Sequence, residues 1–93
     1  NEQKLEVTLV IPVHNEQGNL AQIVEDIRTV FDGWIYEMVF IDDGSVDETA
    51  AELRELKKTI HFLEIVTHAG RYGKSAALAT GGRLARYPWL ASL

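Results

Sequence analysis

Residues 6–13, EVTLVIPV, restrict the fold more than any other feature, because apolar and β-branched side chains follow one another almost without interruption. A strand with one exposed face alternates apolar and polar residues, whereas a strand covered on both faces does not. This run therefore predicts a central strand of a parallel sheet, ending at Pro12. Two further apolar runs, residues 36–41 and 61–67, predict neighbouring strands of the same kind.

An amphipathic helix is expected after the first strand. Its apolar residues recur every three or four positions and form one stripe along about four turns. They are Leu20, Ile23, Val24, Ile27, Val30 and Phe31. Asn15 is the expected turn or N-cap residue before this helix. Asp32-Gly33 is the expected stop.

Two more helices are expected. The second should start near Val46 or Asp47 and end near Lys58, with acidic residues first and lysines last, which suits the helix dipole. The third should cover residues 75–86 and contains Gly81-Gly82. Interior glycines cost about 1 kcal/mol each relative to alanine. We therefore expect them to pack closely against a neighbouring element.

Strands and helices thus alternate, and the final segment YPWLASL predicts a fourth strand. This order predicts an α/β fold, a three-layer Rossmann-like domain. Its sheet should be mainly parallel, with about four strands and helices on both faces. Ligands of such sheets lie outside the carboxyl ends of the strands, so the site is expected at that edge.

Size and composition exclude several classes of protein. A chain of 93 residues forms at most one small domain, and its formal charge of −5 argues against binding nucleic acid. The sequence has no cysteine, which excludes disulfides and thiolate metal sites and fits a reducing compartment. The longest apolar run is too short to span a bilayer, and no signal peptide is recognisable. A cytoplasmic location is therefore expected.

Three polar loops should meet at the carboxyl edge of the sheet: residues 12–16, 42–45 and 68–74. Asp42 and Asp43 are adjacent on an extended chain, so their side chains point to opposite sides. One can accept hydrogen bonds from a ligand while the other braces loop amides. The alternative is that Asp-Asp-Gly-Ser is a simple turn or helix cap.

Neither of two known ligand motifs is complete in this sequence. GRYGKS resembles the phosphate-binding loop G-x-x-x-x-G-K-[ST], but the leading glycine would fall on His68, so the motif fails. Arg71 and Lys74 can still attract a phosphate at the start of a helix, or they can be basic residues of a solvated loop. His14, His61 and His68 lack the spacing of zinc ligands, so no zinc site is predicted.

Three segments in register resemble one family. They are VTLVIPVHNEQGNL, VFIDDGSVDETA and HAGRYGKSAALATGGRLA. Together they closely resemble the N-terminal nucleotide-binding half of family 2 glycosyltransferases with the GT-A fold. Within the family, they are most similar to dolichol-phosphate mannose synthases and bacterial polyprenyl-phosphate glycosyltransferases. The resemblance implies transfer of a sugar, with inversion, from a UDP- or GDP-sugar to an acceptor, in particular a polyprenyl or dolichyl phosphate.

The resemblance also implies the residues of a nucleotide-sugar site. The first loop would lie along the base and ribose, with His14 standing where the family often has Tyr. One aspartate of the pair would bind the base, and the basic loop would approach the base or diphosphate. The implied residues are Pro12, Val13, His14, Glu16, Asp42, Asp43, Gly44, Arg71 and Lys74.

A metal motif of the family, Asp-x-Asp, follows the strand that begins as YPWLASL, and the sequence ends at Leu93 before it. The resemblance therefore implies that residues 1–93 are a nucleotide-binding half without catalytic residues or metal ligands, inactive alone. A divalent ion, Mg²⁺ or Mn²⁺, would serve the whole enzyme. A cytoplasmic membrane surface is a further implied partner. Homodimers are expected on a different ground, because a sheet that stops after its fourth strand exposes an edge and apolar helix faces.

Two other functions remain open at this point. A receiver-like signalling module would use Asp42 or Asp43 as phosphoacceptor, but its acidic pair should follow the first strand. A nucleotidyltransferase-like domain would carry a glycine-rich basic loop after the first strand, where this sequence has Pro-Val-His-Asn.

Overall fold

The structure is a computed structural model that describes residues 5–91. Strands and helices alternate along the chain, and the bounds are as follows. The strands are β1 (Glu6–Val13), β2 (Ile35–Asp43), β3 (Leu63–His68) and β4 (Trp89–Ala91), and the helices are α1 (Leu20–Val30), α2 (Thr49–Lys57) and α3 (Lys74–Leu84). The predicted order of elements is confirmed.

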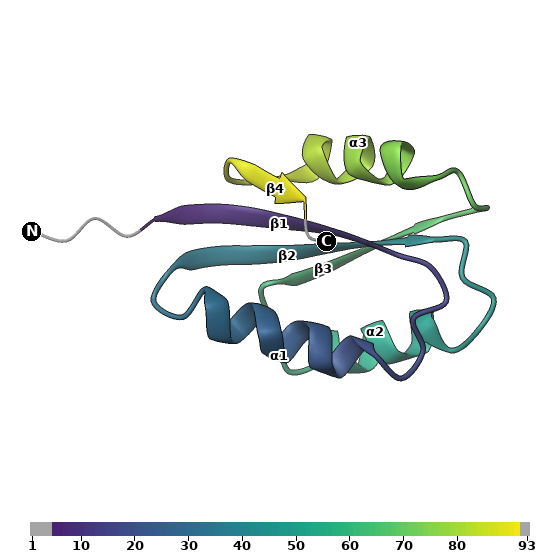
Figure 1. Cartoon of the computed structure of the whole chain (residues 1–93), viewed down its shortest axis with the longest axis horizontal. Helices are drawn as coiled ribbons and strands as arrows, with labels where there is room; N and C mark the ends of the chain where they lie inside the picture. The colour runs from purple at the N-terminus through teal and green to yellow at the C-terminus, as the bar shows by residue number, and fades with distance from the viewer. Residues whose placement is uncertain (1–4, 92–93) are drawn as a thin grey trace, which may run out of the picture.

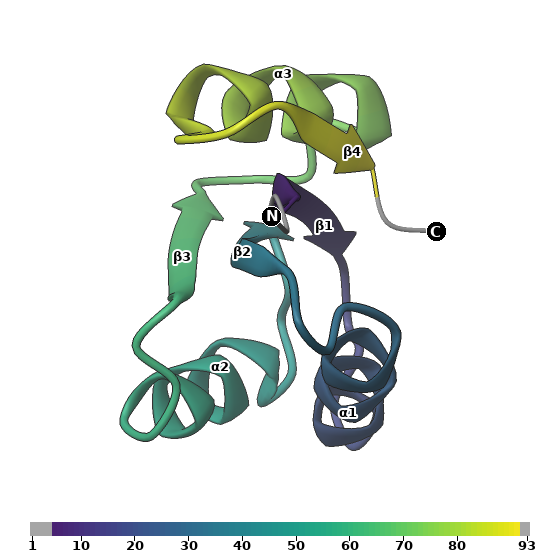
Figure 2. The same ribbon diagram turned by 90° about the vertical axis from the view of Figure 1, so that its left-hand side faces the viewer.

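The four strands form one parallel sheet in the order β3-β2-β1-β4. Helices α1 and α2 cover one face, and α3 covers the other (Figure 1, Figure 2). Alternate residues of β1 therefore enter different cores. Leu9 and Ile11 pack with the α1 and α2 side, whereas Val10 packs with Ala77 of α3. This confirms the α/β fold with helices on both faces, and explains why β1 is apolar throughout.

Helix α3 lies very close to the sheet, as its two glycines predict. A Cβ at Gly81 would collide with the side chain of Val10, and a Cβ at Gly82 would come within 2.8 Å of the Trp89 indole. Since Val10 is fully buried in a central strand, it cannot move aside. The cost of interior glycine is thus offset by close packing of the helix on β1 and β4.

A buried hydrogen-bond network joins β1 and β2 to the turn that follows α3. The Thr8 hydroxyl donates to Glu37 Oε2 at 2.7 Å, and the same carboxylate oxygen accepts the backbone N–H of Arg86 at 2.7 Å. The backbone N–H of Tyr87 donates to Thr8 Oγ1 at 3.1 Å. These bonds hold the turn before β4 beside β1, so a carboxylate inside the sheet is satisfied.

One predicted helix start is wrong. Helix α2 begins at Thr49, and not near Val46 or Asp47. Side chains of the loop after β1 bind two of the amides that precede it. Asn15 Oδ1 accepts the N–H of Val46 at 2.9 Å and Gln17 Oε1 accepts that of Glu48 at 3.1 Å. Of the two roles expected for Asn15, the structure shows the turn: α1 begins only at Leu20, and Asn15 takes a left-handed conformation with φ of 52°.

No helix within residues 5–91 has the length and hydrophobicity needed to cross a membrane.

Candidate functional site

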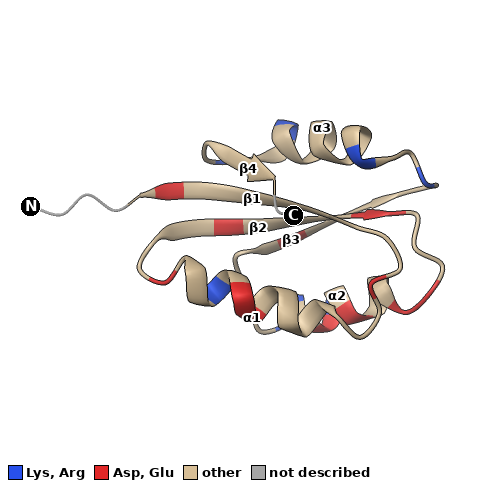
Figure 3. Cartoon of the chain, in the orientation of Figure 1, with Lys and Arg blue, Asp and Glu red and all other residues tan. Residues whose placement is uncertain are grey.

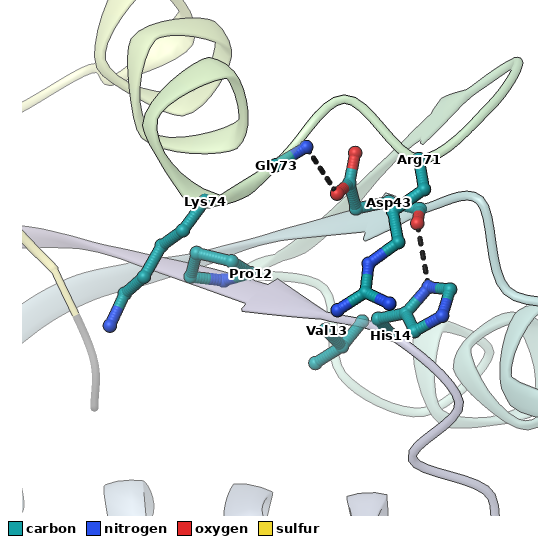
Figure 4. Close-up of a pocket in the computed structure, with 7 residues that line it drawn as sticks. All are labelled: Pro12, Val13, His14, Asp43, Arg71, Gly73 and Lys74. Carbon is teal, nitrogen blue, oxygen red and sulfur yellow. Dashed lines mark hydrogen bonds between the residues drawn. The ribbon is translucent and has the colours of Figure 1, made fainter.

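A pocket of about 230 Å³ lies where the carboxyl ends of β1 and β2 meet the start of α3 (Figure 4). Apolar residues from β1 form its floor, and polar and basic residues from three segments surround them. Its lining consists of Pro12, Val13, His14, Asp43, Arg71, Gly73 and Lys74. The pocket therefore lies at the predicted edge of the parallel sheet.

Asp43 is the residue that organises this pocket. It is 5% exposed, and its carboxylate accepts the backbone N–H of Tyr72 at 3.0 Å and of Gly73 at 2.9 Å. The His68 Nδ1 also lies 2.9 Å from Asp43 Oδ1. Because a carboxylate can only accept hydrogen bonds, His68 donates from Nδ1. Asp43 thus braces the loop that carries Arg71 and Lys74.

These hydrogen bonds also set the acidity of Asp43. Burial alone would raise the pKa of the carboxyl group, but the bonds from His68, Tyr72 and Gly73 outweigh burial and lower its pKa to about 2. The native state therefore holds the ionised form more strongly than the unfolded chain does. Its contribution to stability is complete above about pH 4, the ordinary range of aspartate, and is lost as the pH falls towards the folded pKa.

We therefore expect the Asp43 carboxyl carbon to titrate with a midpoint of about 2 in a ¹³C NMR titration of the folded chain. The amide protons of Tyr72 and Gly73 should report the same transition, because both donate to this carboxylate. A midpoint near the unperturbed value of about 3.9 would show that the bracing bonds do not form in solution.

Asp42 has a different role, as its opposite orientation predicts. It is 1% exposed, and its Oδ1 accepts the backbone N–H of Ser45 at 3.1 Å. The turn interpretation therefore applies to Asp42, whereas Asp43 braces the neighbouring loop. The next residue, Gly44, has φ of 74°, and a Cβ there would come within 2.6 Å of the Gly70 carbonyl carbon. The two loops touch through their backbones at this point.

The loop after β1 is fixed by side chains from the β2–α2 connection and from the first turn of α2. The backbone N–H groups of residues 15, 16, 17 and 18 each donate to one of them. The acceptors are Ser45 Oγ, Thr49 Oγ1, Asp47 Oδ2 and the Glu52 carboxylate, at 2.9 to 3.2 Å. The acidic residues before and within α2 thus bind this loop in addition to facing the helix dipole.

His14 is held in one orientation by two hydrogen bonds. Its Nδ1 lies 2.8 Å from the backbone oxygen of Asp43, which can only accept, so Nδ1 carries a proton. Asn15 Nδ2 then donates to His14 Nε2 at 3.2 Å. The imidazole therefore links the end of β1 to the end of β2 beside the pocket.

The pocket has a basic side, because charge is unevenly distributed along the sequence. All fourteen acidic residues occur at or before Glu64, whereas four of the nine basic residues follow it. Figure 3 shows basic but no acidic residues on α3 and the loop before it, whereas the α1 and α2 side carries acidic residues together with basic ones. Arg71 and Lys74 are exposed at this edge. An anionic ligand would be attracted to that side.

The family assignment is decided by a sequence match over almost the whole chain. A family model described as glycosyl transferase family 2 matches residues 8–93, a span that contains every residue of the lining. The chain belongs to glycosyl transferase family 2. This confirms the family inferred from the three loop motifs.

Family 2 relatives match the chain over most of its length. It is 36% identical over 81% of its length to an undecaprenyl-phosphate 4-deoxy-4-formamido-L-arabinose transferase of Edwardsiella ictaluri, of which it covers 24%. It is 30% identical over 98% of its length to a dodecaprenyl-phosphate galacturonate synthase of Rhizobium johnstonii, of which it covers 28%. The chain therefore spans about a quarter of the length of these relatives.

A solved structure confirms the GT-A fold of this family 2 chain. A mannosyltransferase from Pyrobaculum calidifontis, in complex with GDP-Man and Mn²⁺, matches 89% of the chain with a TM-score of 0.79 and 29% identity. The chain covers 25% of that structure.

Six of the nine residues predicted for the nucleotide site line the pocket: Pro12, Val13, His14, Asp43, Arg71 and Lys74. Three do not. Asp42 and Gly44 lie behind it in the turn, and the Glu16 carboxylate accepts a bond from Asn19 Nδ2. Sequence reasoning missed His68, which is bonded to Asp43, and Thr80, which is bonded to His68. The position of His68 at a strand end was a signal, whereas nothing marked Thr80.

Within residues 5–91, no group of three or more His, Asp or Glu side chains could hold a metal ion. The donors of this pocket therefore do not fit a divalent ion by themselves, and they are assigned no metal.

Proposed function

We propose that this chain binds the nucleotide of a UDP- or GDP-sugar for a glycosyltransferase of family 2. The observation that carries the proposal is the convergence of His14, Asp43, Arg71 and Lys74 on one pocket at the carboxyl edge of the sheet. Family membership supports it. The mannosyltransferase of similar fold, solved in complex with GDP-Man, supports the donor class.

The diphosphate would lie against the start of α3. Gly73 and Lys74 both line the pocket there, and the first N–H groups of a helix together with a lysine form a favourable site for phosphate. Pro12 and Val13 offer an apolar surface to the base or ribose, and Arg71 can stack or pair with either. Glu16, Asp42 and Gly44 would shape the site from behind its lining.

The reaction that we propose is inverting transfer to a polyprenyl phosphate. An acceptor phosphate oxygen would attack the anomeric carbon from the side opposite to the nucleoside diphosphate, whose bond to that carbon breaks. Because the acceptor is already anionic, it needs no general base. The names of two relatives, an undecaprenyl-phosphate sugar transferase and a dodecaprenyl-phosphate galacturonate synthase, support this acceptor class. The proposed role of the chain is to hold the leaving diphosphate with its cationic side.

Other features of the whole protein are also proposals. A divalent ion, Mg²⁺ or Mn²⁺, is proposed with ligands outside the described residues, and the Mn²⁺ of the related mannosyltransferase supports it. Work at the cytoplasmic face of a membrane would follow from a polyprenyl phosphate acceptor. Dimerisation through the β4 edge, where Trp89 and Leu90 are exposed, is a further proposal.

A nucleotide titration tests the donor site. We expect UDP or GDP, added to ¹⁵N-labelled chain at millimolar concentration, to shift the amide signals of Val13, His14, Arg71, Gly73 and Lys74. Lys74→Ala should weaken this binding about tenfold, since a charge-assisted bond to phosphate contributes on the order of 1.5 kcal/mol or more. Lys58→Ala is the matched control, because Lys58 is an exposed lysine paired with Glu55 on α2.

Absence of shifts at the pocket with either nucleotide would overturn the proposal. Equal effects of Lys74→Ala and Lys58→Ala would remove Lys74 from the phosphate site.

A further inference from the structure

His68 lies behind the pocket and joins β3 to two other elements. It is the last residue of β3, paired in register with Asp43 of β2, and its side chain is 11% exposed. The Nδ1 donates to Asp43 Oδ1 at 2.9 Å, and Nε2 lies 3.0 Å from Thr80 Oγ1 on α3. The Thr80 hydroxyl also contacts the backbone oxygen of Ala76, at 3.0 Å. One imidazole therefore connects the carboxylate to the middle of the helix.

The same carboxylate determines where the basic loop lies. Asp43 Oδ1 accepts from both His68 and the Tyr72 N–H, and Oδ2 accepts from the Gly73 N–H. If the His68 bond were lost, the carboxylate could rotate and both amide bonds would lengthen. Arg71 lies between Gly70, which contacts the neighbouring loop, and the bound amide of Tyr72. Lys74 directly follows the bound amide of Gly73. A change at His68, which does not itself line the pocket, would thus reach both cations through Asp43.

We propose that His68 and Thr80 are positioning residues for nucleotide binding, which act through Asp43 on Arg71 and Lys74. The inference rests on the proposed function. Neither side chain lines the pocket, so neither contacts the nucleotide. The imidazole fixes the rotamer of Asp43, and Thr80 fixes the imidazole from the helix that Lys74 begins. The β3–α3 loop is thereby held in its binding conformation before a ligand arrives, which reduces the cost of ordering it.

Two substitutions at His68 separate its two hydrogen bonds. The side-chain amide of asparagine can reach the place of Nδ1, whereas that of glutamine can reach the place of Nε2. We expect His68→Gln to keep the Thr80 contact but lose Asp43, and His68→Asn to do the reverse. In the nucleotide-free chain, the amide protons of Tyr72 and Gly73 should move upfield in His68→Gln and stay near their original positions in His68→Asn.

Nucleotide affinity should follow the same pattern. We expect His68→Gln to weaken UDP or GDP binding about fivefold to tenfold, the effect of a lost bond to a charged group. His68→Asn should restore most of the affinity. Thr80→Val should weaken binding about twofold to fivefold, since it loosens the imidazole without removing it. Thr29→Val is the matched control, because Thr29 makes the same bond to the carbonyl four residues earlier, on α1 away from the pocket.

Urea unfolding of each variant separates positioning from a general loss of stability. Unchanged Tyr72 and Gly73 amides in His68→Gln, or equal nucleotide affinity in wild type, His68→Gln and Thr80→Val, would overturn the inference. If His68→Gln does not fold, Thr80→Val decides the question. If the wild-type chain binds neither nucleotide, the proposed function fails together with the inference, whereas normal wild-type binding with unaffected variants overturns the inference alone.

Discussion

Asp43→Ala should weaken UDP and GDP binding by about a hundredfold, because it removes every hydrogen bond that holds the basic loop to β2. Bonds to a charged group contribute about 1.5 to 3 kcal/mol each, and 1.4 kcal/mol corresponds to tenfold in affinity. Isothermal titration calorimetry or the NMR titration measures the loss. The amide proton signals of Tyr72 and Gly73 should move upfield at the same time, because both amides lose their hydrogen bond to the carboxylate.

Asp43→Asn tests whether these bonds, and not the volume of the side chain, are responsible. Asparagine presents one N–H₂ group where the aspartate presents an acceptor, so it cannot satisfy donors at both oxygens. We therefore expect it to bind nucleotide almost as weakly as the alanine variant. Asp32→Asn, at an exposed residue between α1 and β2, serves as the control. Wild-type affinity in Asp43→Asn would refute the bracing role.

Gly81→Val should destabilise the fold by about 3 kcal/mol, the upper part of the range for overpacked cores. Even a single Cβ at this position collides with the side chain of Val10, which is fully buried in β1. A domain of this size has a stability of roughly 5 to 14 kcal/mol, so the loss would be a large fraction of the total. The free energy of unfolding in urea measures it.

Ala79→Val is the matched control for this prediction. It introduces the same residue into the same helix, but at an exposed position. There we expect a loss of stability of only about 0.5 kcal/mol, from the lower helix propensity of valine. Similar losses in the two variants would show that α3 does not pack on β1 as closely as the structure has it.

The order of elements was predictable because it depends on local patterns. Residues 6–13 are apolar on both faces of a strand, and the stripe that starts at Leu20 is apolar on one side of a helix; both patterns are read from neighbouring residues alone. The stripe was predicted too long, because Val30 is 68% exposed. The glycine pair in α3 likewise indicated close packing. The contacts before α2 were not predictable, because the side chains that bind the amides of Val46 and Glu48 belong to residues some thirty positions earlier, Asn15 and Gln17.

The candidate site was likewise predictable only in part. The rule for parallel sheets placed three loops at one edge, and six of the predicted residues line the pocket there. Their nucleotide contacts stay predictions until binding is measured. The sequence did not show which aspartate braces the neighbouring loop. This depends on the direction in which each side chain leaves β2 and on the donor groups that it meets there. Thr80 had no signal in the sequence, and the only signal of His68 was its position at the end of a strand, since the importance of both residues comes from their contacts.

The sequence by itself therefore determined the α/β alternation, the edge where a ligand would bind and the family to which the chain belongs, because periodicity and motif spacing are local properties. Only the tertiary structure decided that Asp43 holds Tyr72 and Gly73, that Asp42 closes its own turn, and that Gly81 lies against Val10. These facts depend on which atoms the folded chain brings within about 3 Å of one another, the range of hydrogen bonds and close contacts.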